Sequence, residues 1–126
     1  MLATQLDAYR TVQKTAISGR ELEASVLTQA AFRLTACQNN WNAPDKDTKL
    51  HEALTHNQRI WTILQSELVK DDNPLPKQIR EDLISLSIFI DKRTFDIMAY
   101  PDPAKLNILI NINLNIAAGL RGNSGG

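Results

Sequence analysis

The sequence predicts an all-α protein, a single bundle of about five helices joined by short turns rich in proline and aspartate. Apolar residues recur at three- and four-residue steps through most of the chain, which is the period of a helix. Prolines and aspartates gather between these periodic segments, where they end one helix or cap the next. The 126 residues suffice for one core, so we expect a single domain over residues 1–121.

The composition favours a protein that binds other proteins in a reducing compartment. Fourteen basic and fourteen acidic residues balance, and no long run of like charge occurs, so we expect no direct nucleic-acid partner and no membrane partner. Cys37 is the only cysteine, so no internal disulfide can form. The N-terminus has no apolar leader segment, which predicts a cytoplasmic protein. Residues 122–126 are rich in glycine and serine and are expected to form a flexible tail.

Two helices are expected in the first third of the chain. The first covers Thr4–Ile17 and has only a thin apolar stripe. Ser18-Gly19-Arg20-Glu21 then fits the S-x-x-E capping box, in which the serine caps a free N–H group and the glutamate reaches back. This box predicts that a second helix begins at Ser18 and ends near Trp41.

A third helix follows the loop that contains Pro44, with Asp47 or Thr48 as its cap. Its apolar stripe is the cleanest in the chain and approximates a heptad seam. A polar residue, Asn57, interrupts this seam, and such residues often fix register or meet a polar group of a partner. The seam comprises Leu50, Ala53, Leu54, Asn57, Ile60, Trp61, Leu64 and Leu68.

A fourth helix, Pro76–Tyr100, follows the turn Asp71–Pro76 and carries more apolar surface than one face can hold. We expect it to be central, with the other helices packed around it. A second apolar stripe of Ile84, Ile88 and Phe95 lies almost opposite the first. This surplus stripe fits either the core or an interface with a partner.

The last element, after Pro101-Asp102-Pro103, permits two interpretations. Isoleucine and leucine alternate with Asn111, Asn113 and Asn115, which is the period of a strand. Leu109, Ile112, Ile116 and Leu120 also fit one helical stripe. We favour a helix because Asp102 can cap it and because a lone strand would have no partner.

The chemistry-bearing residues do not form a recognisable catalytic or metal motif. His51 and His56 are five residues apart, which turns them about 140° away from each other on a helix, whereas the zinc-protease motif needs four. Cys37 lies on an apolar stripe, which favours a buried structural cysteine. We therefore expect no enzyme activity, no cofactor and no metal, and a hydrolase that uses either histidine is a weak alternative.

Six segments in a fixed order carry a family resemblance: Tyr9, Arg20–Ala24, Ala30–Leu34, the pattern from Leu50 to Trp61-Thr62, Asp72–Pro76 and Ile112–Gly122. Taken together, they resemble the FlaF family, flagellar biosynthesis regulators of alphaproteobacteria. The resemblance covers nearly the whole chain, with Gly19 in place of an expected proline and Leu114 in place of an expected polar or basic residue.

The resemblance implies a chaperone or regulator that binds flagellin, promotes flagellin synthesis and export during filament assembly, and acts together with FlbT. The alternative is a post-transcriptional regulator that acts with FlbT on flagellin mRNA and is not a chaperone. Flagellin termini are amphipathic helices, which an apolar surface of a bundle could cover. From the residue pattern we predict that the partner contacts Asn57, Trp61, Ile84, Ile88, Phe95, Ile112, Asn113, Ile116 and Leu120.

Overall fold

A computed structural model describes the backbone of residues 2–122 and the side chains of residues 20–122. Four α-helices and one short 3₁₀ helix make up this part of the chain, and it contains no strand. The all-α class is thereby confirmed, with four α-helices in place of about five, and the last element is a helix. The elements are α1 (Leu2–Asn39), α2 (Lys46–Leu68), α3 (Lys77–Ala99), η1 (Pro103–Lys105) and α4 (Leu106–Leu120).

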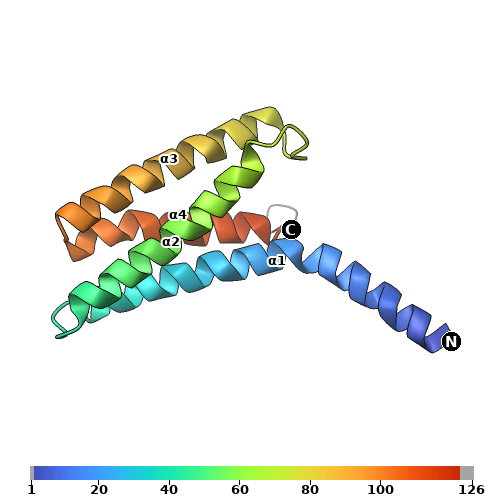
Figure 1. The fold of residues 1–126 in the computed structure, drawn as a ribbon, viewed down its shortest axis with the longest axis horizontal. Helices are drawn as coiled ribbons and strands as arrows, with labels where there is room; N and C mark the ends of the chain where they lie inside the picture. Colours follow the sequence, from blue (N-terminus) through green and yellow to red (C-terminus); the bar gives the residue numbers. More distant parts are fainter. Residues whose placement is uncertain (1, 123–126) are drawn as a thin grey trace.

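The first helix is continuous, and the predicted helix start at Ser18 is wrong. The backbone of α1 is helical from Leu2 to Asn39, through the Ser18-Gly19 pair. No proline interrupts this stretch, so its N–H groups can bond to carbonyl groups of the preceding turn and need no cap. Figure 1 shows that the first part of α1, drawn in dark blue, extends away from the other helices at an angle to the rest.

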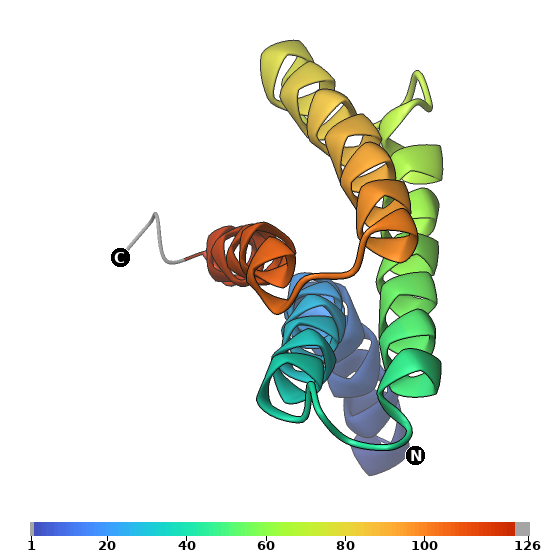
Figure 2. The same ribbon diagram turned by 90° about the vertical axis from the view of Figure 1, so that its left-hand side faces the viewer.

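The C-terminal part of α1 forms the centre of the bundle. It packs along α4 on one side and along α2 on the other (Figures 1 and 2). Three alanines of α1, Ala24, Ala30 and Ala31, are fully buried, and their small side chains allow the neighbouring helices to approach closely. Leu27 and Leu34 fill the spaces between them.

The helix α3 is peripheral, which corrects the expectation that it is the central helix. It packs on α2, and Figure 2 shows its N-terminal end leaning away from α4. Only a narrow face is buried, formed by Ser87, Ile90, Thr94 and Ile97. An apolar stripe on a helix is buried only if another helix covers it, and α2 covers one stripe of α3 while leaving the other uncovered.

The seam predicted for α2 is confirmed as its core-facing side. Leu50, Ala53, Leu54, Asn57, Trp61 and Leu68 are buried, while Ile60 and Leu64 are partly buried against the same core. The helix begins slightly earlier than predicted, at Lys46. Asp45 occupies the cap position without a side-chain hydrogen bond, so neither Asp47 nor Thr48 caps this helix.

The turn before α4 has the predicted cap. The Ala104 N–H group donates to the Asp102 carboxylate over 2.9 Å, and Asp102 precedes η1 in an extended conformation. The adjacent Lys105 ammonium donates to the Tyr100 carbonyl and pairs with Asp96 at 3.1 Å. These contacts hold the start of α4 against the end of α3.

Two further predictions lie outside the described residues. They are the glycine- and serine-rich tail, from residue 123 on, and the side-chain stripe of the first 19 residues, which includes Tyr9. Within the described part of the chain, every helix is too short or too polar to cross a bilayer.

Replacing Leu54 tests the packing of the seam. Leu54 is fully buried, so Leu54→Ala should lower the free energy of unfolding by about 2–5 kcal/mol through lost contacts and a cavity. Urea denaturation followed by circular dichroism measures this change. Ile63→Ala on the same helix is the control, because Ile63 is 58% exposed and its truncation should cost less than about 0.5 kcal/mol. Equal effects of the two changes would contradict the packing described here.

Candidate partner-binding surface

The structure separates the predicted contact residues into three places. Asn57, Trp61 and Asn113 lie in the core. Ile112, Ile116 and Leu120 are partly buried on α4. Ile84, Ile88 and Phe95 lie on the outside of α3, where Ile88 and Phe95 are 45% and 59% exposed. The fold therefore does not bring these side chains together as one surface.

The three polar or aromatic core residues form a hydrogen-bonded network centred on Asn113. The Trp61 indole N–H donates to Asn113 Oδ1 over 2.9 Å. The Asn113 amide nitrogen donates to Asn57 Oδ1 over 2.7 Å and to the Leu27 carbonyl over 3.2 Å. One side chain of α4 is thus bonded to α1 and twice to α2, and all three side chains are almost completely buried.

This network fixes the register of three helices. Buried polar groups are costly unless bonded, so α4 can shift along α1 or α2 only by breaking these bonds. The Asn57 amide nitrogen is buried and has no partner, so only the carbonyl half of this side chain is satisfied. In this fold Asn57, Trp61 and Asn113 offer no surface to a partner, and their placement in a contact surface is corrected to a role in the core.

One flank of α4 is partly uncovered. Two contacts with α1 mark the edge of α4 that faces it. Asn107 accepts a hydrogen bond from Gln38 of α1, and Arg121, just past the end of α4, pairs with Glu21 of α1 at 3.1 Å. At about 100° per residue, Ile108, Ile112 and Ile116 lie roughly 120–160° around from this edge. We call these three residues the α4 flank.

Ile108 belongs to the α4 flank but was missed by the sequence-based prediction. It is 37% exposed, and it precedes Ile112 and Ile116 at the same four-residue step. The four-residue spacing was the signal that could have identified it.

Phe89 is the exposed aromatic residue on the side of α3 that is closest to α4. Asp96 marks this side, because its carboxylate pairs with Lys105 at the start of α4. Phe89 precedes Asp96 by seven residues and so lies nearly in line with it. The ring is 44% exposed, so exposed apolar side chains lie both on this side of α3 and on the α4 flank.

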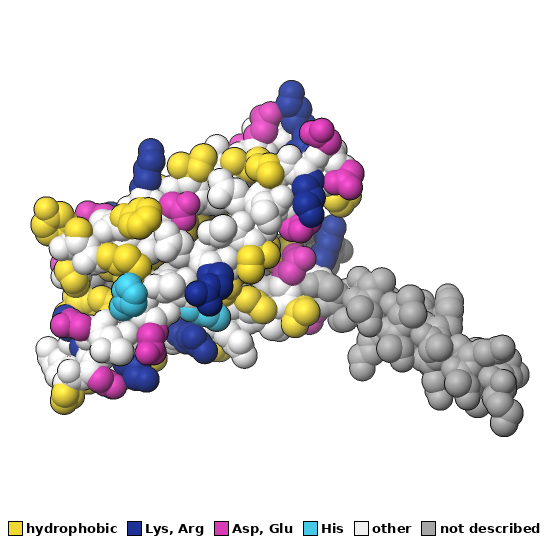
Figure 3. Space-filling view, in the orientation of Figure 1, with side chains coloured by type: hydrophobic (Ala, Val, Ile, Leu, Met, Phe, Trp, Pro, Cys, Tyr) yellow, Lys and Arg dark blue, Asp and Glu magenta, His cyan; other side chains and the backbone are white. Residues whose placement is uncertain are grey.

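The remaining predicted residues form a separate stripe on the outer side of α3. Ile84, Ile88 and Phe95 each lie about 160–180° around the helix from Leu86, which packs against the core. Met98 lies between these three residues and the buried face of α3. With Leu50 and Leu54 of α2, it lines a hollow of about 320 Å³. Figure 3 shows hydrophobic side chains spaced along α3 on the face turned to the viewer. We call Ile84, Ile88 and Phe95 the outer stripe.

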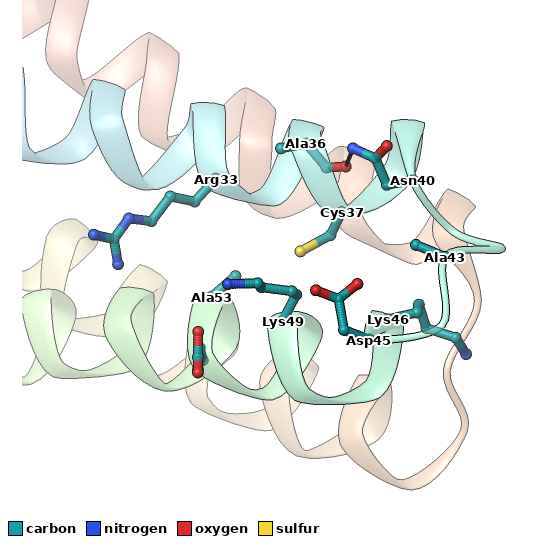
Figure 4. A pocket seen from close by; sticks show the side chains of 10 residues that line it. Arg33, Ala36, Cys37, Asn40, Ala43, Asp45, Lys46, Lys49 and Ala53 are labelled. Atoms are coloured by element: carbon teal, nitrogen blue, oxygen red, sulfur yellow. Dashed lines mark hydrogen bonds between the residues drawn. The ribbon is translucent and has the colours of Figure 1, made fainter.

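A larger hollow, of about 610 Å³, lies where the end of α1 meets the start of α2. Figure 4 shows the Cys37 sulfur turned into it, with Lys49 and Asp45 opposite. Burial raises the pKa of the Cys37 thiol, and the Lys49 ammonium acts in the opposite direction. The predicted burial of Cys37 is confirmed, with 8% of the residue exposed. The lining carries charges of both signs, so it defines no particular class of ligand.

The comparison with protein families identifies the kind of protein that has this architecture. The family model described as "Flagellar protein FlaF" matches residues 5–120, which is most of the chain. The chain belongs to the FlaF family of flagellar proteins. Comparisons with curated proteins and with solved structures gave no significant match.

Four of the segments that carry the resemblance to the FlaF family meet in the core. Arg20–Ala24 and Ala30–Leu34 supply buried residues of α1, and the segment that ends at Trp61-Thr62 supplies the seam of α2. The last segment, Ile112–Gly122, contributes Asn113. The FlaF-like features of the sequence therefore describe mainly how α1, α2 and α4 are held together.

The two histidines of this FlaF-family chain have different surroundings. His51 is exposed. His56 is partly buried, and the pKa of its imidazole is lowered by desolvation and by the nearby Arg33 and Arg59.

Trp41 is partly buried against the core, with the Lys46 ammonium 4.5 Å from the centre of its ring.

Replacing Asn113 tests the buried network. Asn113→Ala should destabilise the fold by at least about 2 kcal/mol, because it leaves the Trp61 N–H group and the Asn57 oxygen buried and unbonded, at about 1–3 kcal/mol each. Urea denaturation measures the change. Asn111→Ala is the matched control, since Asn111 is exposed on the same helix and should be nearly neutral. A difference of less than about 0.5 kcal/mol between the two variants would contradict the network.

Proposed function

We propose that this FlaF-family chain is a flagellin-binding secretion chaperone that promotes flagellin synthesis and export, acting with FlbT as a second partner. Membership of the family makes it a flagellar protein. The observation that supports a chaperone role is that Phe89 and the α4 flank are apolar and that no described helix fully covers them. An uncovered apolar surface of this kind is typical of a protein-binding site.

The dimensions of the α4 flank suit an amphipathic helix as the bound element. Ile108, Ile112 and Ile116 follow each other at four-residue steps, so they form a row about 12 Å long, at about 1.5 Å per residue. A bound helix would place its apolar side chains, spaced by three or four residues, between these isoleucines and Phe89. Such a contact would keep the amphipathic terminal helices of flagellin from associating with each other before export.

The charge of α4 supports a protein partner over RNA. The helix Leu106–Leu120 contains no charged residue, so a contact on it gains nothing from phosphate groups. Binding to RNA depends steeply on salt because counterions are released. We therefore expect flagellin binding to change little with ionic strength and to show a negative heat-capacity change, which is the mark of apolar burial.

The experiment compares two residues of equal exposure on different sides of α4. Ile108 on the α4 flank is 37% exposed, and Leu114, in line with the edge that faces α1, is 38% exposed. Ile108→Asp should weaken flagellin binding at least tenfold in titration calorimetry, because it places a charge in the apolar contact. Leu114→Asp should leave the affinity within about twofold, and melting curves of both variants check that the fold is intact.

Two results would contradict the proposal. If the wild-type chain binds FlbT but not flagellin, the protein is a regulator and its effect on flagellin is indirect. If both aspartate variants weaken binding equally while remaining folded, the contact is not on the α4 flank.

A further inference from the structure

The outer stripe has charged neighbours whose order along the helix is self-complementary. On one edge of the stripe lie Arg80 and Asp91, and on the other edge lie Glu81 and Lys92. Each edge thus has one charge near the N-terminal end of α3 and the opposite charge about three turns later. We propose that two copies of this chain associate through the outer stripe, with their α3 helices antiparallel.

The register of this pairing follows from the apolar residues. If Ile84 of each copy lies opposite Ile88 of the other, the two-fold axis passes near residue 86. Residues whose numbers add to about 172 then lie at the same height, because antiparallel helices run in opposite directions. Arg80 comes next to Asp91 of the second copy, and Glu81 comes next to Lys92, each within one residue of the same height.

Both pairs fall on matching edges of the two helices. In an antiparallel pair of helices, each edge faces the same edge of the second copy, unlike the arrangement in a parallel pair. Arg80 therefore faces Asp91 on one edge, and Glu81 faces Lys92 on the other. Two-fold symmetry makes four intermolecular ion pairs around a seam of isoleucine and phenylalanine.

A parallel pair could also bring opposite charges together at the edges, but it fails at Lys77. This exposed lysine precedes Ile84 by seven residues, so it lies on the centre line of the outer stripe. In a parallel two-fold pair the two Lys77 ammonium groups would face each other, and like charges at close range oppose association. The antiparallel register instead places Lys77 opposite the Phe95 ring of the second copy, where a cation is favourable. Lys77 therefore selects the antiparallel pair.

The Ile88 and Phe95 side chains are accessible for this contact. They are 45% and 59% exposed, and Glu81 and Lys92 are also exposed, whereas Ile84, Arg80 and Asp91 are partly buried. The Arg80 guanidinium also donates one hydrogen bond to the Lys70 carbonyl of its own chain over 3.2 Å, and its other N–H groups remain for a second copy. Glu81 has one contact within its own chain, with Lys77 at 3.9 Å, which is long for an ion pair and leaves the carboxylate accessible to a second copy. The seam is short, so we expect a reversible dimer whose population depends on protein concentration.

The inference is independent of the proposed chaperone function, because the two surfaces are separate. The outer stripe lies on the outer side of α3, and the α4 flank lies on α4. Sedimentation velocity over a concentration series tests it, starting from the chain mass of 14.1 kDa. The wild-type mass should rise towards twice this value. Ile88→Asp should hold the protein at the monomer mass, whereas Phe32→Asp, at an exposed aromatic residue of α1, should not.

A charge exchange tests the antiparallel register itself. Glu81→Lys places two lysines opposite each other in both symmetric positions, and Lys92→Glu does the same with two glutamates, so each variant alone should dissociate at least tenfold more readily. When the two variants are mixed, the two introduced side chains face each other at one position, and the unchanged Glu81 and Lys92 face each other at the other. The mixture should therefore form a dimer at protein concentrations at which each variant alone is monomeric. In a parallel pair the introduced lysine would face Arg80, so mixing would restore nothing.

Three outcomes would overturn the proposal. The first is a wild-type chain that remains monomeric at all concentrations. If, in addition, Ile88→Asp abolishes flagellin binding, the outer stripe is a binding surface for a different protein. The second is a dimer that persists in Ile88→Asp, which would place the contact elsewhere. The third is a mixture of the charge variants that stays monomeric while the wild type dimerises, which would exclude this register.

Discussion

The bonds made by the Asn113 side chain are the constraint on which the rest of the bundle depends. Its amide links α4 to the α1 backbone at Leu27 and to Asn57 and Trp61 of α2. An apolar core would tolerate small shifts of one helix along another, whereas these bonds permit one register. The unsatisfied Asn57 nitrogen shows that this specificity has a cost in stability. These bonds therefore hold α1, α2 and α4 in one register, and α3 packs on α2 outside this group.

Several features of the helices could be predicted because their signals are local, although the capping box at Ser18 lies inside a continuous helix and marks no helix start. The seam of α2, the cap at Asp102 and the burial of Cys37 follow from spacing and residue type, and each is present in the structure. The helical interpretation of the last element is also correct, and its asparagines lie on different sides of the helix. Asn107 bonds to Gln38, Asn113 lies in the core, and Asn111 and Asn115 are exposed.

What could not be predicted was which helix covers which. The two apolar stripes of α3 suggested a central helix, but burial depends on the number of neighbours, and α3 has one main neighbour. Small residues decided the centre, because Ala24, Ala30 and Ala31 let α2 and α4 approach α1. For the same reason, the sequence could not show that the predicted contact residues lie in separate places. Asn57 and Trp61 have the residue types of an interface, but hydrogen bonding to Asn113 across 56 and 52 positions of sequence places them in the core.

The position of α3 at the edge of the bundle leaves apolar surface in two directions, and the two surfaces differ in the partner that they suit. The surface of Phe89 and the α4 flank has an uncharged helix on one side, so it can select a partner only by shape and apolar spacing. Each edge of the outer stripe carries opposite charges at its two ends, so these charges pair when two copies lie antiparallel. The outer stripe therefore discriminates strongly among partners and suits a second copy of this chain. A helix bound at the first surface would not reach the second, since the outer stripe points away from the core. Self-association through α3 would therefore leave one α4 flank accessible on each chain, and a dimer could bind two amphipathic helices at once.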